Sequence, residues 1–241
     1  MRLRGSATGA SSTTSGTARQ ITFGAVTNPT ATNTTYYARV TLYSDTGWAT
    51  PVDTGTVAAS TATQITLSGT MDESLVFCTG TSITGTNCGT VSGSSVNFGT
   101  FSSTSTSSGT SVMAASTNGT SGYSITVNGS TLTCSCAGSP TIAALGSQTA
   151  SSTGTAQFGA NLRDNATPNV GADPSGSGSG TYTANYGTAD QYRFVTGDSV
   201  ASASGATNAN TFTASYIVNV PGSQAAGSYT ATMTYIATAT F

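Results

Sequence analysis

Four cysteines are the residues of this 241-residue chain whose spacing most directly suggests chemistry. Cys78 and Cys88 enclose a turn-rich stretch, whereas Cys134 and Cys136 are separated by a single serine. Neither spacing is the CxxC pattern that closes a zinc site, so we expect disulfides and no bound metal. A Cys78–Cys88 bond would join two strand ends and lower the entropy of the unfolded chain.

The sequence leaves the partner of Cys134 and Cys136 open. If a strand continues through both residues, their side chains share one face and lie too far apart for a direct bond. A bulge or turn at Cys-Ser-Cys would permit the direct bond. Otherwise one of the two cysteines pairs elsewhere in the chain or with another subunit.

Groups that could catalyse a reaction are scarce. The chain has no histidine, so no Ser–His or Cys–His nucleophile pair can be built. Asp72 and Glu73 are adjacent carboxylates, but neighbours on a strand point to opposite faces and cannot flank a glycosidic bond. We therefore expect no enzymatic activity and no cofactor.

Four acidic residues of the second half fall in expected loops, where their oxygens could bind calcium: Asp164, Asp173, Asp190 and Asp198. No EF-hand or repeat organises them, and aspartates in such loops more often form turns. We predict no metal site from them.

Several aromatic residues could stack against a sugar: Tyr36, Tyr37, Trp48, Tyr182 and Tyr186. Tyrosine is also an ordinary strand residue, because its ring packs well on a pleated surface. We favour this structural role, and at most one of the neighbours Tyr36 and Tyr37 can face a core.

Strand-like alternation dominates the chain, and helical periodicity is almost absent. The expected strands are 19–26, 34–44, 61–69, 73–79, 94–101, 156–163, 190–197, 211–220 and 227–241, and 122–134 is an expected β-hairpin. Within 122–134, alternation runs into Asn128-Gly129, a dipeptide that favours a hairpin turn. We expect an all-β fold of one or two Greek-key or immunoglobulin-like β-sandwich domains.

The last expected strand, 227–241, alternates most regularly. Tyr229, Met233, Tyr235 and Phe241 would pack a core, while a row of threonines faces outward. Ile236 interrupts that row and is a candidate contact point outside the domain. We expect strand 211–220 to be an antiparallel neighbour of this strand through the short intervening loop.

Low-complexity sequence suggests the domain boundaries. Residues 1–18 form a candidate flexible arm that could act as a donor strand. The Ser/Thr-rich stretch 101–111 separates a first β domain, 19–104, from a second, 105–241.

Composition excludes some partners. Only 6% of the residues are charged, the net charge is −2, and all six basic residues are arginine. Nucleic acid and anionic membranes are therefore not expected partners, and without an apolar run of about 18 residues we expect no membrane insertion. The cysteines and the hydroxyl-rich composition predict a secreted, cell-surface protein. The start lacks the apolar region of a signal peptide, so we expect a mature or trimmed form, or a sequence given without its leader.

The chain resembles a family of secreted surface proteins predicted from genomes of ultra-small, host-associated candidate-phylum (Patescibacteria-type) bacteria. The likeness covers roughly residues 19–241 and is carried by TPVDTGTVAASTATQITLSGTMDESLVFCTGTSITGTNC, QFGANLRDNATPNVGADPSGSGSG, ADQYRFVTGDSVASASG and NTFTASYIVNVPGSQAAGSYTATMTYIATATF. The resemblance implies an extracellular, β-rich surface protein with no assigned activity. Family members commonly carry a leader and a further N-terminal β segment that this sequence lacks. More loosely, the Thr-rich final strand looks like those of pilins assembled by strand exchange.

The leading hypothesis is a structural subunit of an extracellular, pilus-like filament or surface array. Residues 1 to about 20 of one subunit would add a strand to the next, or strand edges that lack protective lysines would pair. The product would be a homopolymer, and the candidate subunit-interface residues are Leu3, Ile21, Phe23 and Ile236. The alternative is a monomeric adhesin or carbohydrate-binding module that recognises a host-cell surface or its glycans. A β-rich hydrolase would need an acid pair in a cleft.

Overall fold

A computed structural model describes residues 22, 24–27 and 29–240. The chain divides into two units, Met1–Thr70 and Met71–Phe241, so the division falls after residue 70 and not after the expected 104. Residues 71–104 join the second unit because the strand Leu75–Gly80 pairs with Ser107–Thr117, across the low-complexity stretch. The expected arm, 1–18, lies outside the described residues.

The described part of the first unit is built around a hairpin of β1 (Thr35–Tyr43) and β2 (Pro51–Ser60). Its turn is organised by Asp45, whose carboxylate accepts hydrogen bonds from the backbone N–H groups of Gly47, Ala49 and Thr50. Hydrogen bonds from Ala49 and Thr50 are the main cause of a lowered pKa at Asp45. Val40, Leu42 and Val57 stay exposed, so the described hairpin has no core of its own.

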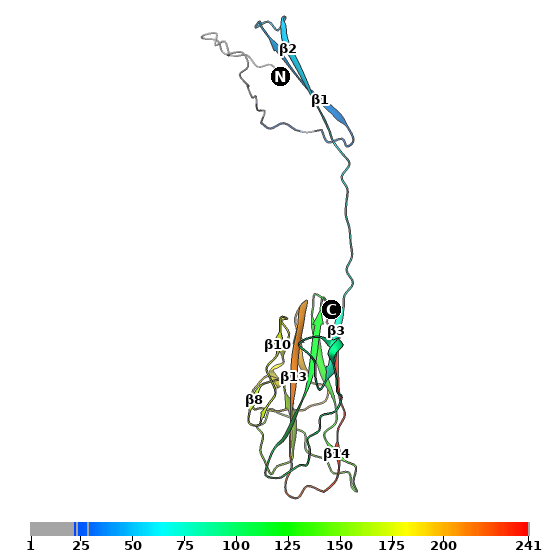
Figure 1. Cartoon of the computed structure of the whole chain (residues 1–241), viewed down its shortest axis with the longest axis vertical. Coiled ribbons are helices and arrows are strands. Elements are labelled where there is room, and N and C mark those ends of the chain that lie inside the picture. The colour runs from blue at the N-terminus through cyan, green and yellow to red at the C-terminus, as the bar shows by residue number, and fades with distance from the viewer. Residues whose placement is uncertain (1–21, 23, 28, 241) are drawn as a thin grey trace. The chain divides into compact units, whose positions relative to one another are not determined.

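The second unit is a sandwich of two antiparallel sheets (Figure 1). The first sheet has the order β10 (Ser175–Gly176), β13 (Thr207–Asn219), β4 (Ser107–Thr117) and β3 (Leu75–Gly80), with β7 (Gln157–Asn161) also paired to β13. The second sheet has the order β11 (Thr181–Tyr182), β12 (Ser199–Ala203), β5 (Tyr123–Gly129) and β15 (Met233–Ala239). Short elements complete the unit: β6 (Thr133–Cys134) with β14 (Tyr229–Thr230), β8 (Asn165–Ala166) with β9 (Asn169–Val170), and the 3-10 turns η1 (Cys88–Thr90) and η2 (Ala184–Tyr186). The expected all-β, sandwich-type fold is confirmed.

The core lies between the two sheets and follows the period-2 pattern of their strands. On β5, Tyr123, Ile125 and Val127 are buried and alternate with half-buried polar residues. They pack against core residues of the opposite sheet, including Met113 and Phe212. Burial of such large apolar side chains is worth about 1.5–3 kcal/mol each relative to exposure, which makes this interface the main stabilising feature of the unit.

Two expectations are wrong: the hairpin turn at Asn128-Gly129 and the strand that lies next to β15. Asn128-Gly129 forms no hairpin turn, because both residues lie within β5 and pair with Thr234 and Met233 of β15. β15 is not the neighbour of β13: it belongs to the second sheet, whereas β13 lies between β4 and β7 in the first. The loop after β13 therefore carries the chain from one sheet to the other instead of closing a hairpin.

Among the described residues, no helix has the length and hydrophobicity needed to traverse a bilayer.

Candidate functional site

One side of the sandwich is open and carries a groove of about 1090 Å³, which we call the edge groove. Its two walls are residues 94–101 and residues 224–233, and it begins where β3 ends at Gly80. β3 and β15, the edge strands of the two sheets, are neighbours on this side. None of the residues that line the groove is charged.

Part of the border of the edge groove is formed by backbone groups without ladder partners. Residues 94–101 were expected to form a strand, yet they make no backbone–backbone hydrogen bond with any described residue. The other wall includes Tyr229 and Thr230, which pair with β6. At Met233 this wall reaches β15, which is the last strand of its sheet and pairs only with β5. Backbone N–H and C=O groups at such edges can accept an additional strand.

The first wall is packed against the sandwich by side chains instead of a ladder. Val96, Phe98 and Phe101 are half-buried and contact the core. Gly109 of β4 permits this close approach, because a β-carbon there would lie 2.5 Å from a methyl carbon of Val96. The Phe101 ring contacts the Tyr229 ring of the second wall, with their centroids 6.1 Å apart, so the two walls meet at this point.

The floor of the groove includes a chain of three hydroxyl groups. The Tyr216 hydroxyl lies 2.8 Å from the Ser111 hydroxyl and 2.7 Å from the Tyr235 hydroxyl. Burial raises the pKa of Tyr216 and raises that of Tyr235 well above its usual value. Both phenols therefore stay protonated at neutral pH and act as hydrogen-bonding groups, not as bases.

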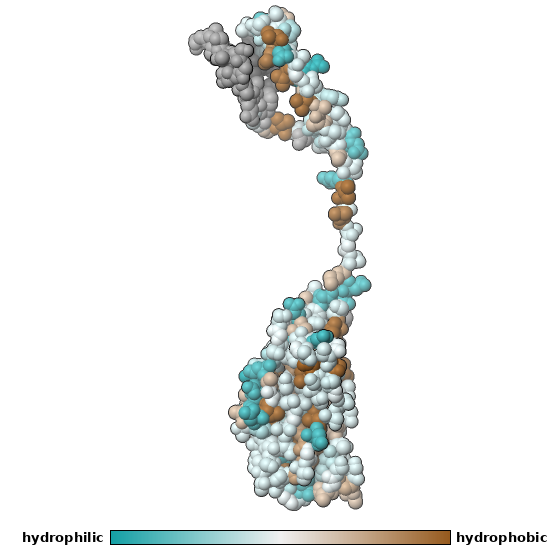
Figure 2. Space-filling view, viewed as in Figure 1, coloured by the Kyte–Doolittle hydropathy of each residue, from teal (hydrophilic) through white to brown (hydrophobic). Residues whose placement is uncertain are grey.

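The segment before β3 is extended and has no strand partner among the described residues. Residues 64–71, which we call the linking segment, make no hydrogen bond with any described residue and are all exposed. Ile65, Leu67 and Met71 are 86%, 90% and 85% exposed, respectively. They alternate with Gln64, Thr66, Ser68 and Thr70. Figure 2 shows hydrophobic side chains uncovered in the stretch that joins the two units.

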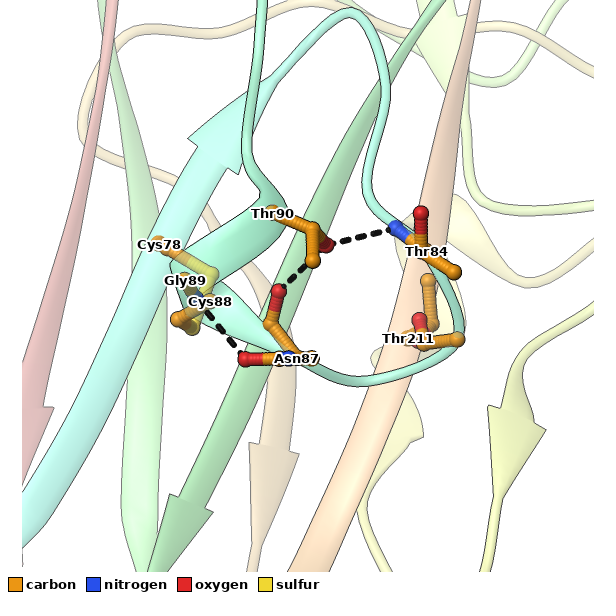
Figure 3. The surroundings of a disulfide bond; sticks show 8 residues. Cys78, Thr84, Asn87, Cys88, Gly89, Thr90 and Thr211 are labelled. Atoms are coloured by element: carbon orange, nitrogen blue, oxygen red, sulfur yellow. Dashed lines mark hydrogen bonds between the residues drawn. A yellow bond between two sulfur atoms is a disulfide. The ribbon is translucent and has the colours of Figure 1, made fainter.

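The expected Cys78–Cys88 disulfide is present, with the two α-carbons 5.6 Å apart. It anchors a loop that crosses the outer face of the first sheet (Figure 3), where Thr211 of β13 donates a hydrogen bond to the Gly85 carbonyl. Cys78, Ala114 and Thr211 are in register on three adjacent strands. Ala114 points away from the sandwich core and is nevertheless buried, which the covering loop explains.

Inside this loop, short-range hydrogen bonds fix η1. The Asn87 side chain accepts from the Gly89 N–H at 2.9 Å, and Thr90 donates its hydroxyl to the Asn87 carbonyl (Figure 3). The Thr84 N–H donates to the Thr90 hydroxyl at 2.9 Å and closes the loop. The disulfide is therefore part of a covering element and lies on a different face from the edge groove's walls.

Cys134 and Cys136 bond directly to each other. This arrangement is possible because β6 ends at Cys134 and the chain turns, with the Ser139 N–H donating to the Cys136 carbonyl at 3.0 Å. The strand therefore does not continue through both cysteines, which was the condition that would have kept their sulfur atoms apart. All four cysteines are oxidised, and none remains free.

Three of the four loop aspartates have structural partners for their side chains. Asp173 pairs with Arg163 at 2.6 Å and Asp198 with Arg193 at 2.8 Å. Asp190 accepts from the backbone N–H groups of Ala166 and Thr167. Across the described residues, no three His, Cys, Asp or Glu side chains gather as a metal site would need.

A buried amide pair holds the same loops against β7. Asn161 and Asn165 exchange two side-chain hydrogen bonds, at 2.6 and 2.9 Å. Asn161 also donates to the carbonyls of Thr188 and Gln191. Both amides are almost fully buried, so the pair connects β7 to the neighbouring loops through hydrogen bonds inside the fold.

The aromatic candidates for sugar stacking are dispersed. Tyr186 is buried in the core, and the Tyr182 ring is covered by the Arg163 guanidinium at 5.1 Å. Trp48 packs edge-on against Tyr43 at the hairpin turn, and Tyr37 is exposed on β1. The adjacent acids Asp72 and Glu73 are exposed just before β3.

Only one of the four candidate interface residues lies in the described part of the chain. Ile236 is 47% exposed on the outer face of β15, between two exposed threonines. Leu3, Ile21 and Phe23 lie outside the described residues. No expectation from the sequence pointed to the edge groove, and the linking segment overlaps the expected strand 61–69.

Comparison of the chain with protein-family models, with curated proteins and with solved structures finds no match.

Proposed function

We propose that this chain is a structural subunit of an extracellular filament or surface array that assembles by β-strand exchange or edge pairing. The observation that carries the proposal is the edge groove, which is uncharged and bordered by backbone edges without strand partners. A monomeric sandwich normally protects such an edge with lysine, proline or a covering element. An added strand would cover this edge, so a neighbouring subunit is a fitting partner.

Two further features support an extracellular role. All four cysteines form disulfides, which persist in oxidising compartments and are rare where thiols are kept reduced. The sparse charge also means that contacts between subunits would depend on backbone pairing and apolar packing more than on ion pairs. Assembly of this kind is expected to depend only weakly on salt concentration.

The test is the mass and shape of the full-length chain across a range of concentrations and salt. Light scattering after size-exclusion chromatography, followed by negative-stain microscopy, should show linear assemblies that grow with protein concentration. A single monomeric species at every concentration would contradict the filament proposal. Binding to a glycan array by that monomer would support the adhesin alternative instead.

A further inference from the structure

We propose that the linking segment, residues 64–71, of one copy enters the edge groove of a second copy as an added β-strand. This inference rests on the proposed function and names the two surfaces that would join neighbouring subunits. It also replaces the expected donor, residues 1 to about 20, with a segment whose conformation and exposure are described.

The linking segment has the properties of a strand that lacks its sheet. Ile65, Leu67 and Met71 fall on one side of an extended chain, and polar residues alternate on the other. Half-buried strands show this pattern, yet here the apolar side is almost fully exposed. Eight residues extend about 26 Å, which is longer than a typical strand.

The edge groove offers the linking segment backbone hydrogen-bonding partners and an apolar surface. An entering strand would find an unpaired backbone along residues 94–101 and the free edge of β15, which reaches the groove at Met233 and Tyr235, and could form hydrogen bonds on both of its sides. Its apolar row would face the half-buried rings of Phe98, Tyr229 and Tyr235. Its polar row would remain at the surface, so the alternation of the segment matches the single open side of the groove.

The segment is joined to β3 at the strand end opposite the groove. The Asn118 side chain accepts from the Ser74 N–H at 2.6 Å and donates to the Asp72 carbonyl at 2.9 Å. The Asn118 N–H also bonds to the Ser74 carbonyl, so these contacts prolong the pairing of β3 and β4. The segment therefore leaves at the Leu75 end of β3, whereas the groove begins at the Gly80 end. Residues 72–74, which connect the segment to β3, are thereby fixed at the end of β4.

Donation between copies uses two different surfaces, one as donor and one as acceptor. Such a heterologous contact leaves a free donor at one end and a free groove at the other. Further copies can then add without closing the assembly. The same geometry accounts for a filament without any additional interface.

The donor is tested with Leu67→Asp in the full-length chain, because a carboxylate in the apolar row cannot enter the groove without losing its hydration. Leu67 is 90% exposed, so the substitution should leave the sandwich folded. We expect the concentration needed for assembly to rise at least about tenfold. Thr66→Asp places the same charge on the opposite side of the segment and is the matched control, with a much smaller effect.

The acceptor is tested with Ala226→Arg, which places a bulky side chain at an exposed position of the groove wall. Ala206→Arg introduces the same residue at an exposed position outside the groove and serves as its control. Urea unfolding of all four variants, compared with the unsubstituted chain, establishes that each one is folded. We expect Ala226→Arg to abolish assembly and Ala206→Arg to leave it unchanged.

Mixing the two defective variants gives the sharpest result. The Leu67→Asp chain keeps its groove and the Ala226→Arg chain keeps its linking segment, so one junction can form between them. The mixture should contain dimers of one copy of each and nothing longer, as measured by native mass spectrometry. Absence of this dimer would overturn the inference.

The outcomes separate this inference from the proposed function. If the unsubstituted chain never assembles, the filament proposal fails, and the inference fails with it. If the unsubstituted chain and the Leu67→Asp variant assemble equally well, the filament stands and the donor assignment is overturned. The inference is supported if Leu67→Asp and Ala226→Arg fail to assemble, both control variants assemble, and the mixture of the two defective variants forms the dimer.

Discussion

The hydroxyl groups of Tyr216 on β13 and Tyr235 on β15 lie 2.7 Å apart and join the two sheets across the sandwich. The strands that carry them follow each other in the chain, separated only by a loop and the two-residue β14. They face each other through the core instead of lying side by side. This contact forms part of the floor of the edge groove, so it links the stability of the fold to the proposed assembly surface.

Tyr216→Phe should destabilise the chain more than Tyr235→Phe. Loss of the Tyr216 hydroxyl leaves both Ser111 and Tyr235 without this partner, and an unsatisfied buried group costs about 1–3 kcal/mol. Loss of the Tyr235 hydroxyl leaves the Ser111–Tyr216 bond intact, so about 0.5–1.5 kcal/mol is expected. Urea unfolding provides the measurement, with the exposed Tyr37→Phe as control. Equal losses for the two buried tyrosines would contradict a chain centred on Tyr216.

Stability should fall as the pH rises above about 10, the usual pKa of tyrosine. Burial raises the pKa of Tyr123 and of Tyr186 to about 12, so the folded state keeps protons that the unfolded state has already released. Their contribution is complete below pH 10 and is lost as the pH rises through the folded-state pKa. Each can lower the free energy of unfolding by up to about 1.4 kcal/mol per pH unit in this window.

Tyr123→Phe isolates one of these groups. The Tyr123 hydroxyl is buried and makes no hydrogen bond with a described residue, so its removal breaks no contact in the fold. At pH 7 the variant should be as stable as the unsubstituted chain or more stable, by up to about 1 kcal/mol. Unfolding free energies measured at several pH values should fall less steeply above pH 10. An unchanged slope would show that Tyr123 does not contribute to the alkaline transition.

Replacing Cys78 and Cys88 together with serine should lower stability by about 2–3 kcal/mol, as expected for a loop of this length. The Cys134–Cys136 bond closes a much shorter loop, so the same replacement at these two cysteines should lower stability by less, about 1–2 kcal/mol. Chemical unfolding of both double variants tests the order. Hydrogen exchange should also show faster exchange over the loop 81–92 in the first variant only, because that loop is anchored by Cys88.

Asn161→Asp should be strongly destabilising at neutral pH. The Asn161 amide donates to the Asn165 side chain and to the carbonyls of Thr188 and Gln191, and a carboxylate would set a buried charge against these three acceptors. We expect a loss of about 3 kcal/mol or more, decreasing as the pH falls and the introduced carboxyl becomes protonated. Thermal unfolding at several pH values measures it, with the exposed Asn208→Asp as control. A pH-independent loss would point to packing instead of charge.

Much of the fold class could be predicted from local pattern. Alternation of large apolar and small polar residues on β5 and β15 predicts which side chains face the core, because successive side chains of any strand point to opposite faces. The Cys78–Cys88 bond was similarly predictable, since both cysteines lie close together in the chain around a turn-rich loop. These features depend on residues near each other in sequence.

The pairing of the strands was not predictable in the same way. A period-2 pattern is identical whichever strand lies alongside, so the pattern of β15 could not distinguish β13 from β5 as its neighbour. Asn128-Gly129 shows the same limit, because the long-range ladder with β15 holds in an extended strand two residues that favour a turn locally.

Local sequence pattern and long-range strand pairing both matter for the linking segment and for residues 94–101. Their sequences predict strands, and local alternation accounts for the exposed row of Ile65, Leu67 and Met71 and for the packing of Val96 and Phe98. Neither segment has a ladder partner among the described residues, because a strand is completed only by a second strand that long-range packing brings alongside. The local pattern therefore identifies the face that must be covered, while the arrangement of the two sheets determines where an edge stays open.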